Sequence, residues 1–219
     1  MGIVKEYTAL VDPKRAALVV IDMQNDFCSL GGHFQKQGYD IKKIRSIIPA
    51  VKALIDDLPP EVKVIHVLTI REPDGSDNHW RRHKLLPERM RKRREGEGIG
   101  LNVVRGTWGA QVVEELTPRP QDYVFVKRRN SAFYQTDLEM CLRLWGIDTL
   151  IFCGVMAEIC VESTIRDAFN RDFDIVVVEN GVAGYSDEYT AHMLDLMRVA
   201  FGIVCRAEEV KNLFPSFTP

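Results

Sequence analysis

Six short apolar segments recur along the chain. Their length and nearly continuous apolar character are typical of strands buried on both faces. Because helical or irregular stretches separate them, the pattern predicts a mostly parallel, six-stranded sheet with helices on both faces. No repeat or change in composition divides the chain, so we expect one α/β domain over residues 1–219. The predicted strands are residues 16–21, 62–70, 123–127, 150–153, 174–178 and 201–205.

Several stretches between these strands have apolar residues at a helical period. Residues 42–58 place six apolar side chains on one face, and Pro59-Pro60 ends the pattern. Residues 136–139 (TDLE) have the sequence of a capping box, which predicts a helix that Gly146 closes. A further helix is expected after Ser186. The chain therefore alternates strands and helices from end to end.

Residues 150–168 combine a strand, a tight turn and a helix. Gly154 allows the turn, and from about Glu158 onward the apolar residues recur at helical spacing. Cys160 is therefore expected in the first helical turn, where unpaired N–H groups and the helix dipole lower the pKa of a thiol. Backbone donors at such a turn can also stabilise an oxyanion. The alternative is a structural cysteine that packs as a small hydrophobic residue.

Two ionisable residues stand at the carboxyl ends of predicted strands, where the active sites of open α/β sheets gather. Asp22 follows the first strand, and Lys127 ends the third. With Cys160 they form a coherent set for acyl transfer, in which Asp22 moves protons and Lys127 favours the thiolate. Taken singly, each residue is better explained as a turn cap, a strand end or a packed thiol. Their equivalent positions favour a catalytic triad.

Composition and charge narrow the function classes. The chain has 46% hydrophobic and 27% charged residues, a net charge of −2 and a pI of about 6.2, so no overall field draws it to nucleic acid or to a membrane. No apolar run has the length of a membrane span, and residues 1–10 lack a signal-peptide core, so we expect a cytoplasmic protein.

Residues 71–106 are polar and irregular, and we expect a long loop with one helix inside it. Within this loop, residues 81–94 contain eight Lys or Arg. Binding of nucleic acid would normally require a basic domain or interleaved aromatic residues. We therefore interpret the basic run as a solvated helix or an oligomer contact.

The cysteines and histidines do not predict a metal site or a disulfide framework. The five cysteines are widely spaced and odd in number, so we expect free thiols. His79 and His83 could share a helical face, but a zinc site needs a third ligand. We therefore expect no metal and no other cofactor.

Three segments resemble the signature blocks of a known family, the isochorismatase-like cysteine hydrolases. They are VVIDMQNDF (19–27), VKRRNSAF (126–133) and CGVMAEICVESTIRDA (153–168), and they occur in the family's order. The family includes nicotinamidase, N-carbamoylsarcosine amidohydrolase, biuret hydrolase and ureidoacrylate amidohydrolase. The resemblance covers nearly the whole chain and implies a three-layer α/β/α fold.

The resemblance also implies the parts of an active site. It assigns the catalytic triad to Asp22, Lys127 and Cys160. It implies a cis peptide bond between Val155 and Met156. The backbone N–H groups of Met156 and Cys160 would then form the oxyanion hole.

Other residues relate the chain to particular branches of the family. Members that hydrolyse the vinyl ether of isochorismate do not use this cysteine as a nucleophile, so Cys160 favours amide cleavage. Residues 69–74 lack the Asp-x-His pattern with which nicotinamidase-like members often bind a metal. Residues 106–109 (GTWG) resemble the ureidoacrylate and biuret branch most. Glu158 departs from the Asn of many relatives, and its charge would oppose thiolate formation unless its carboxylate points away.

The sequence also supplies candidates for substrate binding. Aromatic residues can form the apolar walls of a small pocket, although core packing is an equally good explanation. Arginines can bind a substrate carboxylate, although most arginines are surface residues. The aromatic candidates are Phe27, Trp108 and Phe133, and the basic candidates are Arg71, Arg128 and Arg129.

We therefore predict a cysteine-dependent amidohydrolase that cleaves a small carboxamide, or a ureido or carbamoyl compound, through a thioester. A nicotinamidase-type or isochorismatase-type hydrolase is the alternative within the family. A thiol redox sensor is a different class, in which Cys153 would act as the resolving cysteine for Cys160. A catalytically idle binding module is a third. Since relatives are commonly dimers or tetramers, we expect a homodimer or homotetramer.

Overall fold

The structure is a computed structural model that describes residues 10–77, 85 and 101–215. At its centre lies a sheet of six strands in the order β3-β2-β1-β4-β5-β6, and every pairing between neighbouring strands is parallel. The predicted sheet is therefore confirmed. The strands are β1 (Ala16–Ile21), β2 (Lys63–Thr69), β3 (Tyr123–Lys127), β4 (Thr149–Val155), β5 (Asp174–Ala183) and β6 (Ile203–Cys205).

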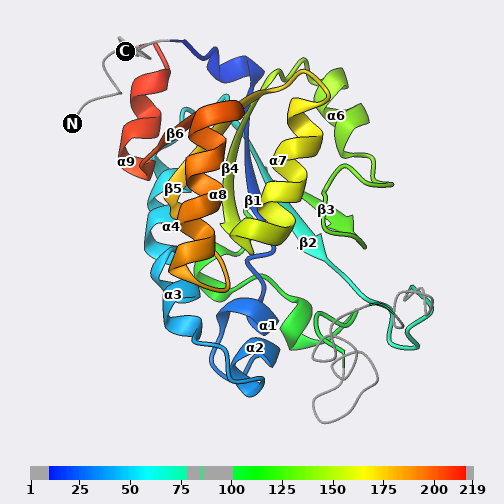
Figure 1. Cartoon of the computed structure of the whole chain (residues 1–219). Helices are drawn as coiled ribbons and strands as arrows, with labels where there is room; N and C mark the ends of the chain where they lie inside the picture. The colour runs from blue at the N-terminus through cyan, green and yellow to red at the C-terminus, as the bar shows by residue number, and fades with distance from the viewer. Residues whose placement is uncertain (1–9, 78–84, 86–100, 216–219) are drawn as a thin grey trace.

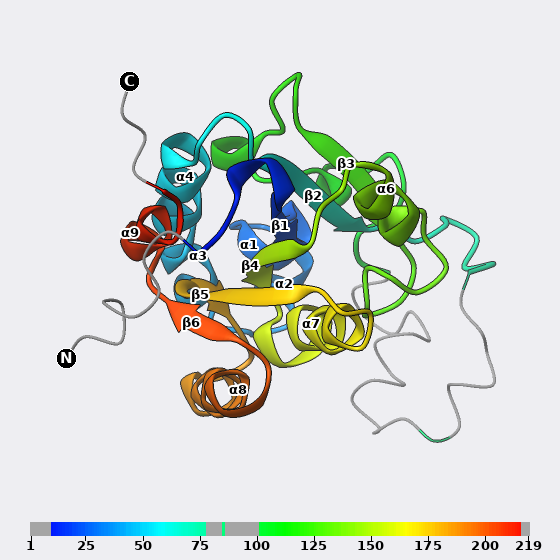
Figure 2. The same cartoon turned by 90° about the horizontal axis from the view of Figure 1, so that it is seen from above.

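Helices cover both faces of the sheet and complete three layers (Figures 1 and 2). One face carries α3 (Ile41–Ser46), α4 (Ile48–Asp57) and α9 (Ala207–Val210). The other carries α6 (Leu138–Leu144), α7 (Glu162–Phe169) and α8 (Asp187–Ala200). The short helices α1 (Asn25–Cys28) and α2 (His33–Lys36) follow β1 at the end of the sheet. Among the described residues, no helix has the length and apolar character to cross a membrane.

The side chains of β1 alternate between two hydrophobic cores. Leu18 and Val20 pack with α3, α4 and α9, whereas Val19 and Ile21 pack with α6, α7 and α8. The chain moves from β1 to β2 and β3, and then returns to β4 on the other side of β1. Because parallel crossovers are right-handed, this reversal puts helices on opposite faces. The switch point, where ligands bind in such folds, lies between β1 and β4.

The helix predicted over residues 42–58 is divided in two. α3 ends at Ser46 and α4 begins at Ile48, with Pro49 in the first turn of α4. A proline inside a continuous helix would lack a donor and clash with the carbonyl group four residues earlier, but the first turn tolerates it. The apolar face is continuous because both helices pack on the same core.

The predicted capping box at residues 136–139 is wrong. The helix begins at Leu138, and Asp137 at its N-cap makes no side-chain capping bond. The Thr136 hydroxyl donates instead to the carbonyl oxygen of Ala132, and the Glu139 carboxylate pairs with Arg171. Thr136 still accepts from the N–H group of Leu138 at 3.3 Å, but the ion pair with Arg171 takes Glu139 out of the predicted box.

The carboxyl ends of β1 and β4 meet at a glycine. Ile21 and Gly154 are register partners, and Gly154 has a φ of 115°. A Cβ at Gly154 would lie 2.1 Å from the carbonyl oxygen of Ile21. This close approach brings Asp22 and the turn that follows β4 to the same end of the sheet.

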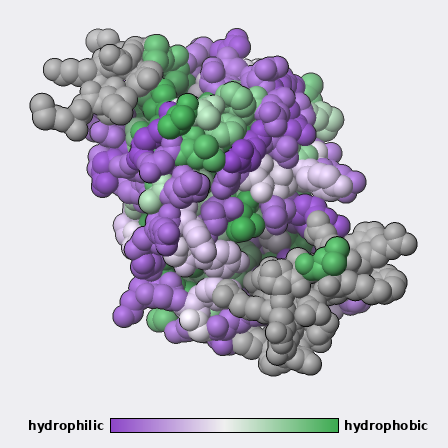
Figure 3. All heavy atoms as spheres, in the orientation of Figure 1, coloured by the Kyte–Doolittle hydropathy of each residue, from purple (hydrophilic) through white to green (hydrophobic). Residues whose placement is uncertain are grey.

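In the orientation of Figure 1, hydrophilic side chains cover most of the described surface (Figure 3). Hydrophobic side chains gather near the carboxyl end of α8, where Val199 is 85% exposed. This end of the molecule is opposite to α1 and α2, so the patch is remote from the carboxyl ends of the strands.

Candidate active site

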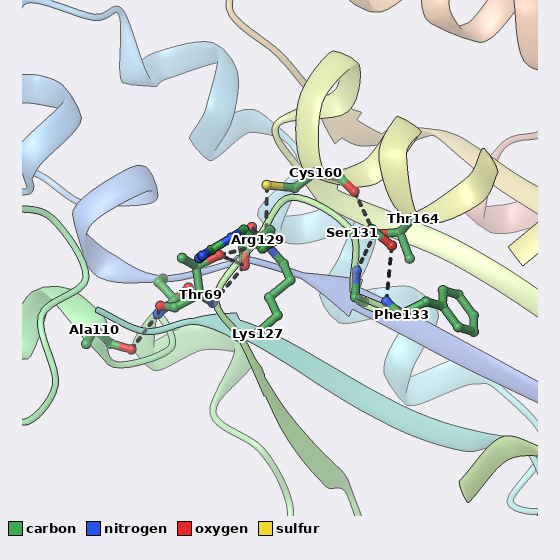
Figure 4. A network of polar contacts seen from close by, with 11 residues as sticks. Thr69, Ala110, Lys127, Arg129, Ser131, Phe133, Cys160 and Thr164 are labelled. Atoms are coloured by element: carbon green, nitrogen blue, oxygen red, sulfur yellow. Dashed lines mark hydrogen bonds and ion pairs between the residues drawn. The ribbon is translucent and has the colours of Figure 1, made fainter. Parts of the chain in front are cut away.

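Asp22, Lys127 and Cys160 lie together at the carboxyl ends of the strands. Figure 4 shows the side chain of Lys127 beside the sulfur of Cys160. The Nζ atom of Lys127 is 2.8 Å from Oδ2 of Asp22 and 3.3 Å from Sγ of Cys160. The side chains of Lys127 and Asp22 are 0% and 2% exposed. The predicted convergence of these three residues is confirmed, and one ammonium group contacts both of the other members.

The backbone of Asp22 turns sharply as it leaves β1. Its φ is 54°, in the left-handed region that residues other than glycine rarely adopt. Its N–H group donates to the carbonyl oxygen of Val67 in β2 at 2.8 Å, which ties the turn to the neighbouring strand. Such conformations cluster at functional sites, where the surrounding structure holds them.

Thr69 completes the polar network, and the sequence analysis missed it. Its hydroxyl donates to Oδ1 of Asp22 at 2.9 Å and accepts from Nζ of Lys127 at 2.7 Å. Its backbone N–H group also donates to Oδ1 of Asp22, at 2.9 Å. The available signal was its position: Thr69 ends β2, which lies between β1 and β3 and therefore between the other two residues.

A buried glutamine holds Thr69 in place. Gln24 is fully buried, and its Oε1 accepts from the N–H group of Thr69 at 2.9 Å. Its Nε2 donates to the carbonyl oxygens of Thr69 and Ala110, at 2.9 Å and 2.8 Å. The side chain thus links the end of β2 to the short 3₁₀ helix Trp108–Ala110.

Cys160 lies in a π-helical turn, Ala157–Val161, that precedes α7. This differs from the predicted first turn of an α-helix. The N–H groups of Ile159 and Val161 both donate to the carbonyl oxygen of Met156, which closes the turn. As the resemblance implied, the peptide bond between Val155 and Met156 is cis. Single π-helical turns occur frequently at functional sites.

The backbone carbonyl group of Cys160 is held by the side chain of Thr164. The hydroxyl of Thr164 donates to the carbonyl oxygen of Cys160 at 2.6 Å and accepts from the N–H group of Ala132 at 3.1 Å. Thr164 is fully buried, so the contact is shielded from water. It joins the turn of the thiol to the loop that follows Lys127 (Figure 4).

The expectation of an acidic thiol is corrected. Burial raises the pKa of the Cys160 thiol from 9.0 to about 12. The ammonium of Lys127 lowers this pKa, but the carboxylate of Asp22 raises it again. The residue as a whole is half-buried, and its sulfur contacts the buried ammonium of Lys127. The thiol is therefore protonated near neutral pH, with a carboxylate beside it that can take the proton.

Lys127 keeps its charge despite its burial. Burial lowers the pKa of Lys127, but the charges and hydrogen bonds of Asp22 and Cys160 outweigh this and raise it above its ordinary value. The carbonyl oxygen of Arg129 also accepts from Nζ, at 3.2 Å. A buried, charged ammonium is stable only with such partners.

The carboxylate of Glu158 is directed away from the thiol, toward the turn between β5 and α8. Its Oε1 accepts from the N–H group of Tyr185 at 2.6 Å, in the turn between β5 and α8. Its Oε2 lies against Gly184, and a Cβ added to Gly184 would be 1.8 Å from this oxygen. The carboxylate therefore anchors the turn of Cys160 to the start of α8, near the partially positive end of that helix.

The three aromatic candidates have different surroundings. The ring of Phe133 packs against Phe173 and points away from the thiol in Figure 4, so Phe133 belongs to the core. Phe27 is 8% exposed and packs edge-on against Phe34. Trp108 is 50% exposed and lines a hollow beside Arg45 and the 3₁₀ helix Glu114–Leu116. Of the three, Phe133 is excluded as a pocket wall.

Of the three candidate arginines, two are engaged by the protein itself. Arg71 donates to Oδ1 of Asn102 at 3.1 Å. Arg128 contacts the Glu72 carboxylate at 2.6 Å. Within the described residues Arg129 has no acidic partner, and its guanidinium donates only to the carbonyl oxygen of Arg128, at 2.8 Å. Arg129 therefore has donors to spare.

The predictions about metals and the basic run involve residues outside the described ones. His79, His83 and residues 81–94, apart from Leu85, are not described. In the part of the chain that the structure describes, no three His, Cys, Asp or Glu side chains are grouped to hold a metal ion.

Cys153 and Cys160 lie on different sides of the sheet. Cys153 is fully buried in the core that α3, α4 and α9 cover. Cys160 packs against the core on the opposite face. A disulfide between them would have to pass through the sheet, which makes Cys153 unsuitable as a resolving cysteine.

Comparisons with known proteins agree with this architecture. The isochorismatase domain matches residues 16–209. The chain is 36% identical to ureidoacrylate amidohydrolase RutB of Agrobacterium fabrum over 176 residues, which are 77% of this chain and 75% of the relative. It is similar to an isochorismatase family protein from Desulfovibrio vulgaris, with a TM-score of 0.76 and 29% identity over 91% of this chain and 97% of that one.

A second similar structure is that of a protein named as an amidase. N-carbamoylsarcosine amidase from Thermoplasma acidophilum has a TM-score of 0.66 and 28% identity, over 90% of this chain and 99% of that one. Because the family match covers most of the chain and includes every strand of the sheet, the protein belongs to the isochorismatase family of hydrolases.

Proposed function

We propose that the protein is a cysteine-dependent amidohydrolase that cleaves a small ureido or carbamoyl compound. The observation that carries the proposal is the position of the Lys127 ammonium, 2.8 Å from the Asp22 carboxylate and 3.3 Å from the Cys160 sulfur. A nucleophile, a proton acceptor and a fixed cation are the groups that acyl transfer through a thioester requires.

In the first half of the reaction, Cys160 forms a bond to the carbonyl carbon of the substrate. Since the thiol is protonated at neutral pH, its proton passes to Asp22 as the bond forms. The negative charge then lies on the carbonyl oxygen, and the N–H groups of Met156 and Cys160 are proposed to stabilise it. The C–N bond breaks when Asp22 returns the proton to the departing nitrogen. An amine or ammonia leaves, and a thioester remains.

In the second half, water replaces the departed nitrogen compound. Asp22 takes a proton from the water as its oxygen attacks the thioester carbon. The C–S bond breaks, the sulfur recovers a proton from Asp22, and the acid product leaves. Lys127 stays charged throughout, which stabilises the carboxylate between its two proton transfers.

The substrate is proposed to carry a carboxylate as well as a ureido group. The first supporting point is similarity to proteins named ureidoacrylate amidohydrolase, since ureidoacrylate bears a carboxylate. The second is Arg129, which has no acidic partner among the described residues and follows Lys127 by two positions. A guanidinium binds a carboxylate through two parallel hydrogen bonds.

An ammonia-release assay over a panel of substrates tests the proposal. The panel contains ureidoacrylate, 3-ureidopropionate, N-carbamoylsarcosine, biuret and nicotinamide. We expect turnover of at least one ureido or carbamoyl acid by the unaltered protein, none by Cys160→Ala, and normal turnover by Cys141→Ala, which removes a thiol from α6. Turnover that survives in Cys160→Ala would overturn the mechanism, and turnover of nicotinamide alone would overturn the substrate class.

A homodimer or homotetramer is proposed as the assembly, on the basis of the family resemblance alone. Light scattering coupled to gel filtration measures the mass of the particle. A mass equal to one 25.0 kDa chain across the working concentration range would overturn this part of the proposal.

A further inference from the structure

The two oxygens of the Asp22 carboxylate are not equivalent as hydrogen-bond acceptors. An ionised carboxylate has roughly four acceptor sites, about two on each oxygen. Oδ1 of Asp22 accepts two hydrogen bonds, from the N–H group and the hydroxyl of Thr69, each at 2.9 Å. Oδ2 accepts from Lys127 at 2.8 Å, which leaves a site on Oδ2. The proton of the Cys160 thiol can therefore be accepted by Oδ2 of Asp22 and not by Oδ1.

We propose that Thr69 is a positioning residue that directs the proton of Cys160 to Oδ2 of Asp22. Its hydroxyl donates its only proton to Oδ1 and accepts from Lys127 with its oxygen, so both charged groups are held by the same atom. With Oδ1 occupied, the carboxylate cannot rotate to offer its other oxygen without breaking two hydrogen bonds. Thr69 does not itself contact the reacting sulfur.

The surroundings of Thr69 are built to keep it in one orientation. Thr69 is 7% exposed. The side chain of Gln24 makes hydrogen bonds with both the N–H group and the carbonyl oxygen of Thr69. The hydroxyl has no freedom to rotate, because both of its roles in the network are filled by buried charged partners. Each hydrogen bond to a charged group is stronger than one between neutral groups.

The inference deepens the proposed function, since it assigns a proton path to the same site, but it can be tested without a substrate. Iodoacetamide alkylates a cysteine only after the thiol loses its proton. At pH 7.5 the Cys160 thiol is protonated, so the rate of its alkylation reports proton transfer to Asp22. Mass spectrometry of digested peptides separates Cys160 from the other four cysteines.

Three variants make the comparison. Thr69→Val keeps the shape and removes the hydroxyl, whereas Thr69→Ser keeps the hydroxyl and removes a methyl group. Thr149→Val is the matched control, because Thr149 is also a buried threonine, but it begins β4 at the opposite end of the strand. We expect Thr69→Val to alkylate about tenfold to a hundredfold more slowly. The serine variant and the control should stay within about threefold of the unaltered protein.

Turnover of an active ureido substrate provides the second readout. We expect kcat of Thr69→Val to fall by a similar factor with little change in KM, because the hydroxyl acts on the proton transfer and not on binding. Equal alkylation rates in Thr69→Val and the unaltered protein would overturn the inference. So would a serine variant as slow as the valine variant, since that would indicate a packing role. If alkylation slows as expected while no ureido substrate is turned over, the inference stands and the proposed function fails.

Discussion

Gly154 lies so close to Ile21 that a Cβ would stand 2.1 Å from the Ile21 carbonyl oxygen. Ile21 precedes Asp22, and Gly154 precedes the turn that leads to Cys160. The distance between the proposed proton acceptor and the proposed nucleophile is therefore set by a contact between two strand ends. This contact is possible because Gly154 has no side chain.

We predict that Gly154→Ala destabilises the protein far more than a change at a glycine with open space. Gly38 is the matched control, because it also has a positive φ, of 81°, but no atom within 4 Å of an added Cβ. Gly38→Ala should cost about 1–2 kcal/mol from its backbone conformation alone. Gly154→Ala adds a clash with backbone and should cost about 3 kcal/mol or more in the free energy of urea unfolding. Equal costs would show that the β1 and β4 ends can separate.

Removing the buried ammonium should destabilise the fold more than removing the thiol. Lys127→Met leaves the Asp22 carboxylate buried without its charged partner, which typically costs about 3–5 kcal/mol. Cys160→Ala removes no charge and should change the free energy of unfolding by less than about 1 kcal/mol. Urea denaturation measures both. Partial recovery in the double variant Asp22→Asn/Lys127→Met would identify the unpaired charge as the cause, and its absence would contradict the explanation.

Stability should fall as the pH rises above 9. Burial raises the pKa values of the Cys160 and Cys205 thiols to about 12, and it raises that of Cys28 further. The folded protein therefore keeps protons that the unfolded chain, with thiol pKa values near 9.0, has already lost. Each such thiol should contribute a decrease of up to about 1.4 kcal/mol per pH unit between pH 9 and 12.

The variant Cys205→Ala isolates one of these thiols, which lies away from the proposed active site at the end of β6. Its free energy of unfolding should decline less steeply between pH 9 and 11 than that of the unaltered protein, by up to about 1.4 kcal/mol per unit. Urea unfolding at stepped pH values measures the slopes. Parallel slopes would mean that the Cys205 thiol titrates alike in the folded and unfolded states.

Arg129 should matter only for substrates with a carboxylate. Arg129→Gln is expected to raise KM for a ureido acid about tenfold or more, and to leave an uncharged urea such as biuret unaffected. Arg128→Gln is the comparison, because Arg128 already contacts Glu72. Steady-state kinetics with both substrates separate the effects. A loss that is equal for charged and uncharged substrates would assign Arg129 a structural role.

Gly184 and Glu158 should behave as a coupled pair. Gly184→Ala places a methyl group 1.8 Å from Oε2 of Glu158 and should cost about 1–3 kcal/mol. Glu158→Ala loses the hydrogen bond to Tyr185 and should cost about 1–2 kcal/mol. Because the second change removes the clash, the double variant should lose less stability than the sum of the two single losses. The difference should be about 1 kcal/mol or more. Strict additivity in thermal unfolding would contradict the contact.

Much of the fold follows from local patterns. The apolar run 16–21 predicts a buried strand because each of its side chains meets one of two cores, and such alternation between cores leaves a continuous apolar sequence. Asp22 and Lys127 could be selected as site residues because the carboxyl ends of parallel strands share one edge. The sequence fails where a tertiary partner competes with a local one, as at Glu139, whose carboxylate pairs with Arg171 instead of completing a capping box.

The sequence by itself determined the parallel sheet, the alternation of strands and helices, and the three chemical groups of the proposed triad, since these depend on the spacing of residues along the chain. Only the tertiary structure decided that Thr69 joins Asp22 to Lys127, that Glu158 turns toward α8, and that burial raises the pKa of the Cys160 thiol. Those properties depend on distances and on the exclusion of water between segments that are far apart in the chain. No spacing within one segment can specify them.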